Sequence, residues 1–329
     1  MKFLKVKLCL ILAITFVGSG LLAEPAIIFD IGGKFDKSYN EAAWGGAEKW
    51  KAETGLAYRE IEIQSEAQRE QALRRLASTG SNPIVMTGFS FESPLSVVAP
   101  DFPDTKFVLI DAEVDQPNVK SIIFKEHEGS YLVGLIAGMT TQTNVVGFVG
   151  GMDIPLIRRF ACGYVQGVKS VNSDIQIIQN MTGNDPSAWN DPIKGGELTK
   201  AQIAAGADIV YHAAGGTGVG VLQAAADAGI LGIGVDSNQN HLHPGSVLTS
   251  MLKRVDVAVY ESFVEGDNLS LGTHVFGVAE DGVGYAVDEN NESLLSDNVL
   301  AAASTAQSDI INGTLVVHNY SDDDTCPMS

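Results

Sequence analysis

Short apolar runs that alternate with helical patterns are the feature that most narrows the fold of this 329-residue chain. Turn-forming residues bound the runs, and most successive runs are separated by a stretch with helical spacing of apolar residues. The runs occupy residues 27–29, 57–63, 84–86, 107–110, 119–124, 145–149, 175–178, 209–212, 232–235 and 247–250. Helical patterns are clearest at residues 68–77, 129–139, 157–171 and 195–204. This alternation predicts an α/β fold of parallel sheets with helices on both faces.

Residues 26–50 contain the clearest strand, turn and helix unit. Its apolar strand ends at Asp30, and the pair Gly32-Gly33 then permits a tight turn. Ser38 stands at the expected N-cap of the following helix, with Glu41 three residues later as its expected capping-box partner. The unit therefore predicts the opening of an α/β lobe.

Polar side chains collect at the carboxyl end of this first strand, where open α/β sheets bind ligands. They are Asp30, Asp36, Tyr39 and Asn40. A similar order of apolar run, glycine pair, acidic turn and helix recurs at residues 145–164. A duplicated lobe would produce this echo, although two such units also arise by chance.

The N-terminus predicts a signal peptide over residues 1–23. Lysines at positions 2, 5 and 7 precede an apolar stretch at residues 8–17, and small residues lead to a cleavage site after Ala23. The apolar stretch is shorter than the ~20 residues of a membrane-spanning helix. Cys9 lies inside that stretch and not at the cleavage point, so we expect no lipoprotein attachment. We therefore expect a soluble, periplasmic protein that is not inserted in the membrane.

Charge and cysteine content limit the partners. Cleavage removes three lysines and no acid, which takes the formal net charge from −19 to −22. An acidic chain without a basic stripe is a poor nucleic-acid binder, so we expect no nucleic-acid partner.

Cys162 and Cys326 remain after cleavage and could pair in an oxidising compartment. Two cysteines so far apart form no disulfide framework, so the sequence leaves this bridge open.

Three apolar runs end in a carboxylate, at Asp30, Asp111 and Asp236. One such aspartate usually caps a helix or forms a turn. Three in equivalent positions converge on one crevice if their strands are parallel, and a carboxylate suits the vicinal hydroxyls of a sugar. Lys253, which follows another run, either donates to the same hydroxyls or pairs with Asp236.

A glycine-rich turn at residues 215–220 follows a strand and opens a helix, which suits contact between a ligand and backbone N–H groups. Its spacing does not fit a dinucleotide fingerprint, so no cofactor is predicted.

His241 and His243 would point to opposite faces of an extended segment, and no metal site is predicted there. No serine lies in a nucleophile-elbow motif, which argues weakly against an enzyme.

The chain resembles the basic membrane protein (BMP, or PnrA-like) family of ABC-transporter solute-binding proteins. The resemblance extends over about residues 26–306, and the order and spacing of several segments carry it. They are FDIGGKFDKSYNEAAWGG, FVLIDAE, EGSYLVGLIAG, VGFVGGMDIPLIRRFACGYVQG, AAGGTGVG, GVDSNQ and LTSMLKRVD.

The resemblance implies a type I periplasmic binding protein fold, in which two doubly wound parallel-sheet lobes are joined by three crossover strands. The ligand of such a protein lies in the cleft between the lobes. We expect the first lobe to contain residues 24–124 and 252–272, and the second lobe residues 125–251 and 273–329.

The resemblance also implies a ligand-binding set. In nucleoside-binding relatives an aromatic ring from each lobe sandwiches the base, and the matching positions here are Tyr39 and Trp189. Tyr39 replaces the usual Phe, which puts a hydroxyl at the stacking ring. The remaining matches are Asp30 and Asn40 for the polar edges of the base, Asp236, Lys253 and the Gly215-Gly216 backbone for the ribose, and Asp111 for an unspecified ligand contact. Arg158, Arg159 and Phe160 lie near the mouth of the cleft in this scheme and are left out of the expected site.

The implied function is capture of a purine nucleoside in the periplasm and its delivery to an ABC permease in the inner membrane. Such a protein needs no catalytic residue, metal or cofactor, and we expect a monomer. The sequence leaves other readings open: the same fold binding a sugar or a free nucleobase, a secreted nucleoside-processing enzyme, or a sensor that signals to a membrane receptor.

Overall fold

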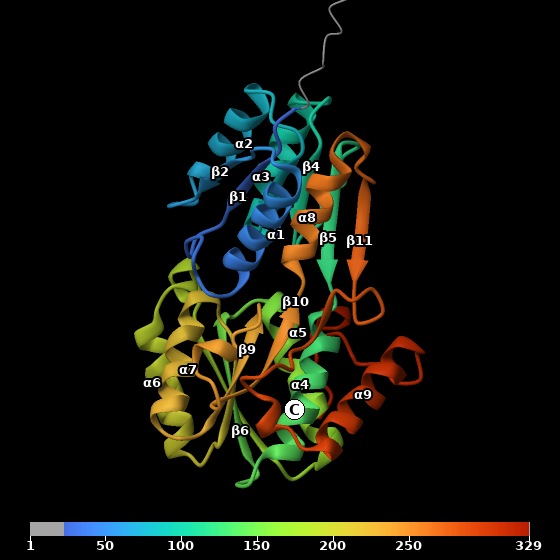
Figure 1. Cartoon of the computed structure of the whole chain (residues 1–329). Coiled ribbons are helices and arrows are strands. Elements are labelled where there is room, and N and C mark those ends of the chain that lie inside the picture. The colour runs from blue at the N-terminus through green and yellow to red at the C-terminus, as the bar shows by residue number, and fades with distance from the viewer. Residues whose placement is uncertain (1–22, 329) are drawn as a thin grey trace, which may run out of the picture.

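The computed structural model describes residues 23–328, over which the chain forms two six-stranded sheets packed with helices (Figure 1). Apart from Ala23, the predicted signal peptide lies outside the described residues. None of the helices within residues 23–328 has the length and apolar character needed to cross a membrane.

The first sheet is entirely parallel, in the order β11-β5-β4-β3-β1-β2. Its strands are β1 (Ala26–Phe29), β2 (Arg59–Glu62), β3 (Ile84–Thr87), β4 (Phe107–Ile110), β5 (Val119–Phe124) and β11 (Gly272–Phe276). The helices of this lobe are α1 (Tyr39–Thr54), α2 (Gln68–Ser78), α3 (Glu92–Val98) and α8 (Val255–Glu265). Every residue of β1, β3 and β4 is buried. Strands covered on both faces read as continuous apolar runs, which explains why the sequence predicts them.

The second sheet has the order β12-β10-β9-β8-β6-β7 and is parallel except for β12, which runs antiparallel to β10. Its strands are β6 (Val145–Met152), β7 (Gln176–Gly183), β8 (Ile209–Ala213), β9 (Leu231–Asp236), β10 (Val247–Lys253) and β12 (Val283–Tyr285). Its helices are α4 (Glu126–Thr140), α5 (Pro155–Val171), α6 (Pro192–Ala204), α7 (Gly218–Asp227) and α9 (Asp297–Ile311). The two predicted α/β lobes are thus confirmed.

Within the described residues the chain passes between the two sheets after β5, after β10 and after β11, which agrees with the predicted crossovers. Strand pairing continues to Lys253 in β10 and to Phe276 in β11. The sequence predicts these two crossings after Met251 and Gly272.

The N-terminus of α1 differs from the predicted capping box. The carboxylate of Asp36 accepts hydrogen bonds from the backbone N–H groups of Ser38 (2.8 Å), Asn40 (2.9 Å) and Glu41 (3.1 Å). Glu41 in turn accepts from the N–H of Lys37 at 3.2 Å. Because Asp36 takes over the capping, the Ser38 hydroxyl is available to the other lobe.

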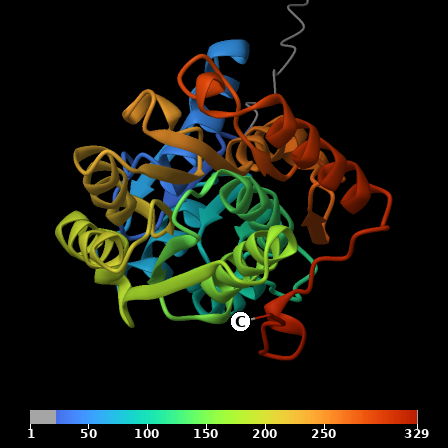
Figure 2. The same cartoon turned by 90° about the horizontal axis from the view of Figure 1, so that it is seen from below.

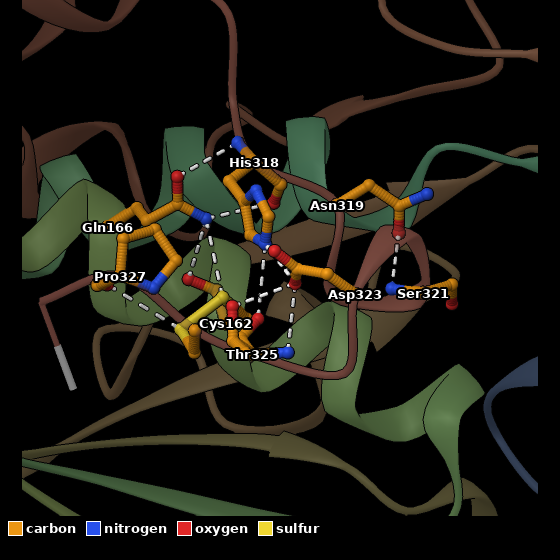
Figure 3. Close-up of a disulfide and its surroundings, with 9 residues drawn as sticks. Cys162, Gln166, His318, Asn319, Ser321, Asp323, Thr325 and Pro327 are labelled. Atoms are coloured by element: carbon orange, nitrogen blue, oxygen red, sulfur yellow. Dashed lines mark hydrogen bonds and ion pairs between the residues drawn. A yellow bond between two sulfur atoms is a disulfide. The ribbon is translucent and has the colours of Figure 1, made fainter.

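A disulfide joins Cys162 in α5 to Cys326 in the C-terminal tail (Figure 3). After α9 the tail runs back along the outside of the second lobe to α5 (Figure 2). Gln166 also holds the tail, since its side-chain oxygen accepts from the N–H of His318 (2.9 Å) and its amide nitrogen donates to the His318 carbonyl (3.0 Å). The sequence did not decide whether these two cysteines pair, and the structure contains the disulfide.

Candidate functional site

A cavity that is partly open to solvent lies between the lobes and is lined by residues of both. All the predicted site residues except Gly216 line it: Asp30, Tyr39, Asn40, Asp111, Trp189, Gly215, Asp236 and Lys253. Gly216 lies behind the cavity wall, against the backbone of Trp189 and the side chain of Asp36.

The carboxyl ends of three strands position the predicted carboxylates. Asp30 directly follows β1, Asp111 directly follows β4, and Asp236 is the last residue of β9. Asp111 and Asp236 adopt left-handed backbone angles, with φ of 76° and 65°. This conformation is rare for residues other than glycine, asparagine and aspartate. The parallel strands thus bring the three side chains to one cavity.

Aromatic rings from both lobes face the same cavity. Tyr39 is the first residue of α1, and Trp189 ends a short 3₁₀ helix, Pro186–Trp189. The Trp189 ring packs directly on the backbone of Gly151 in β6, where any side chain would overlap it. Strand β6 therefore fixes the depth of the indole ring in the cavity.

Lys253 forms the centre of a buried charge cluster. Its ammonium lies 2.7 Å from Asp111 Oδ1 and 3.0 Å from Glu126 Oε1, and Arg159 lies 3.0 Å from Glu126 Oε2. The Lys253 ammonium also lies 5.2 Å from the ring centre of Tyr39. These contacts correct the alternative in which Lys253 pairs with Asp236.

Burial sets the protonation behaviour of the cluster. It raises the pKa of Asp111, and the ammonium of Lys253 opposes that shift. Burial lowers the pKa of Lys253, but attraction to Asp111 and Glu126 outweighs this and raises it. The pKa of Tyr39 is raised, by burial and by the neighbouring Asp111 carboxylate. The neighbouring carboxylates therefore favour the protonated form of Lys253.

Asp236 contacts the opposite lobe. The Ser38 hydroxyl donates to Asp236 Oδ2 at 2.5 Å. Burial raises the pKa of Asp236 to about 6, and Lys253 opposes the shift. Burial also raises the pKa of the nearby Asp36 to about 7. The cavity thus carries carboxylates in excess of its cations, which disfavours anionic ligands.

Backbone contacts close the lobes on one another beside Asp236. The carbonyl of Lys37 accepts from Ser237 Oγ at 2.9 Å and from Gln239 Nε2 at 2.8 Å. Gln239 is itself fixed, since its Oε1 accepts from the N–H of Val235 and contacts the ring of His212. We call Ser38, Ser237, Gln239 and the Lys37 carbonyl, together with Asp236, the interlobe latch.

Sequence reasoning missed several residues of the site. Glu126 and Arg69 are buried charged residues that pair with predicted site residues. Arg69 lies in a predicted helix pattern and Glu126 just before one, and neither pattern indicates these pairs. Phe160 was left out of the expected site but lines the cavity, whereas Arg158 pairs with Asp153 on the surface. Other lining residues that the sequence did not assign to the site are Ile31, Gly32, Gly88, Phe89, Leu156, Ile157, Ala213 and Val235.

Comparison with known proteins gives consistent matches. Residues 24–320 match the family described as ABC transporter substrate-binding protein PnrA-like. The chain is 32% identical to the CD4+ T-cell-stimulating antigen of Listeria monocytogenes, over 89% of this chain and 87% of that protein. It is also 32% identical to the ABC transporter nucleoside-binding protein BmpA of Lactococcus lactis, over 89% of this chain and 88% of that protein.

A solved structure shares the fold. The crystal structure of an ABC transporter solute-binding protein from Aeropyrum pernix superposes with a TM-score of 0.82 at 29% sequence identity. The superposition covers 92% of this chain and 95% of that one.

Proposed function

Because the chain belongs to the PnrA-like family of ABC transporter substrate-binding proteins, we propose that it captures a purine nucleoside between its lobes and delivers it to the permease of an ABC importer. Closure of the lobes would bury the nucleoside and present a liganded shape to the permease. Binding alone accounts for this role, so the proposal includes no catalytic step.

The observation that carries the proposal is one cavity that combines aromatic rings from both lobes with strand-end carboxylates. Tyr39 and Trp189 offer flat apolar faces to a base. Asp236 and Lys253, with the backbone at Gly215, offer acceptors and a donor to ribose hydroxyls. The printed name of the Lactococcus lactis relative, a nucleoside-binding protein, supports the same ligand class.

We also propose that the protein acts in the periplasm as a monomer, after export by the signal peptide at residues 1–23. The disulfide between Cys162 and Cys326 supports an oxidising compartment, because such bonds are rare where thiols are kept reduced.

Calorimetry with adenosine, guanosine, inosine and free ribose tests the ligand class. We expect saturable binding of at least one nucleoside and much weaker binding of ribose. Binding of ribose or a free base alone would replace the nucleoside by that ligand, and no response to any nucleoside would contradict the proposal. Incubation of a bound nucleoside with the protein, followed by chromatography, should recover the nucleoside intact; released base would indicate an enzyme.

A further inference from the structure

Arg69 in α2 is buried and directs its guanidinium at Asp30. Its Nη2 and Nε donate to Asp30 Oδ1 at 2.8 and 3.1 Å. Only 5% of Arg69 is exposed, and its guanidinium lies 5.6 Å from the ring centre of Phe91. A buried arginine is stable only when it is paired, so the two residues hold each other in place.

The pairing leaves the second oxygen of Asp30 without an arginine contact. Both arginine hydrogen bonds reach Oδ1, whereas Oδ2 lies beside Gly88, and the Ser90 side chain also hydrogen-bonds to this carboxylate. Gly88 has a φ of 113°, and a side chain there would approach Oδ2 to 2.8 Å. Asp30, which lines the cavity, is therefore held in one orientation at its first-lobe end.

Neighbouring side-chain donors are committed to the protein. Asn40 Nδ2 donates to the carbonyls of Asp30 (3.2 Å) and Gly33 (3.3 Å). The Thr87 hydroxyl lies 3.0 Å from Asn40 Oδ1 and 3.2 Å from the Ile28 carbonyl, either of which can accept its proton. Asn40 therefore also holds this end of the cavity, in addition to its predicted role in reading the base. Of these groups, the Asp30 carboxylate is the acceptor that remains for a ligand.

We propose that Arg69 is a positioning residue: by its two hydrogen bonds it orients Asp30, the residue expected to address the base, so that the carboxylate accepts from a base edge that carries N–H donors. The inference rests on the proposed nucleoside function. The ionisable groups that face Asp30 are Arg69 and the hydroxyl of Tyr39. Burial raises the pKa of Asp30, and Arg69 opposes this shift.

Inosine and purine riboside provide the matched probes. Inosine carries an N1–H donor, whereas purine riboside has the same ribose and ring system with no donor on that edge. An ionised carboxylate that meets no donor in a closed site loses its hydration without compensation. We expect purine riboside to bind about 10- to 100-fold more weakly than inosine by calorimetry.

Arg69→Gln tests the role of the guanidinium. Without the neighbouring positive charge, burial raises the pKa of Asp30 further. Protonated Asp30 can donate to a ring nitrogen of purine riboside. In Arg69→Gln the ratio of inosine affinity to purine riboside affinity should therefore fall toward one as the pH is lowered from 8 to 5.5. The wild-type preference should change less over this range, because Arg69 opposes the rise in the pKa of Asp30. Asp36 and Asp236 also titrate in this range, but both probes carry the same ribose, so the affinity ratio isolates the base-reading end.

Two variants serve as controls. Arg74 lies on the same helix, and Arg74→Gln breaks only surface pairs with Glu70 and Asp101. The ratio of inosine affinity to purine riboside affinity in this variant should match that of the wild type at every pH. Arg69→Lys keeps a positive charge and should restore part of the preference at low pH.

Asp30→Asn keeps the inference testable if Arg69→Gln does not fold. This isosteric change supplies a donor and should reduce the inosine preference at all pH values. Equal binding of inosine and purine riboside by the wild type would overturn the inference while leaving nucleoside capture intact. An unchanged ratio in folded Arg69→Gln or in Asp30→Asn would overturn it as well. Absence of binding by any nucleoside would instead refute the proposed function.

Discussion

At the scale of single residues, Asp236 is the carboxylate whose removal should affect the ligand most. It is 7% exposed in a cavity between the lobes, where hydrogen bonds to a charged group are strong. If it receives ribose hydroxyls, Asp236→Ala should weaken nucleoside binding by roughly 2–5 kcal/mol in calorimetry. Asp227→Ala, on the exposed end of α7, is the matched control and should leave the affinity unchanged. An unaltered affinity in Asp236→Ala would remove this residue from the site.

Gly151 offers a second test at this scale. In Gly151→Ala the added methyl group would occupy the space of the Trp189 ring, so the ring must move. We expect a change in tryptophan fluorescence and a loss of about 1–3 kcal/mol of nucleoside binding, the usual contribution of a stacking ring. Gly45→Ala faces open space on α1 and should change neither quantity. Unchanged affinity in Gly151→Ala would mean that Trp189 does not stack on the ligand.

The sequence predicted much of the candidate site because each strand-end aspartate is visible from its own apolar run. Arg69 and Glu126 could not be predicted in this way, since each acts on a residue that is distant in sequence. For a related reason, Ser38 occupies the predicted N-cap position but its side chain makes no capping hydrogen bond. Asp36 and Ser38 are both suitable caps, and only the packing of β9 against the start of α1 gives Ser38 its partner Asp236.

At the scale of elements, the C-terminal tail is the segment whose attachment is most easily changed. Cys326→Ser should lower the free energy of unfolding by about 2–5 kcal/mol, as expected for loss of a disulfide that closes a long loop. The described part of the tail contributes no residue to the cavity lining, so nucleoside affinity should change little. Urea unfolding with and without reductant checks both points.

Reductant provides the control for this variant. It should destabilise the wild type to the level of Cys326→Ser and leave the variant unaffected. A large loss of affinity in Cys326→Ser would show instead that the tail supports the site through α5, which carries Ile157 and Phe160.

Burial explains the clearest strand predictions, although β2 and β7, which contain no fully buried residue, were also predicted. Strands β1, β3 and β4 are buried throughout, whereas β11 is largely exposed and gave no apolar run. The disulfide could not be predicted for a different reason. Its cysteines are 164 residues apart, and only the path of the folded tail brings their Cα atoms within 5.5 Å.

At the scale of the whole molecule, the interlobe latch should set how readily the lobes close. Ser237→Ala removes the hydrogen bond to the Lys37 carbonyl without touching the aromatic or carboxylate lining. A net hydrogen bond contributes about 0.5–1.5 kcal/mol, so every ligand should bind roughly two- to tenfold more weakly, by the same factor. Ser308→Ala on α9, an exposed serine of the same lobe, is the control.

Small-angle scattering of the unliganded protein provides an independent readout for this variant. Ser237→Ala should increase the radius of gyration if the latch holds the lobes together. A change in affinity confined to one ligand would place Ser237 in ligand recognition and not in closure.

The position of the Lys253 cluster has a consequence for the order in which the site is assembled. Lys253 ends β10 where the chain leaves the second sheet, and Glu126 begins α4 just after the chain has entered it. Atoms next to a pivot move little when two bodies rotate about it, so these ionic contacts persist whether the halves are apart or together. Trp189 and Asp236 lie on the half that swings toward Tyr39. A solute entering an open molecule would therefore meet the preformed ion-paired end first, and the second ring would complete its enclosure.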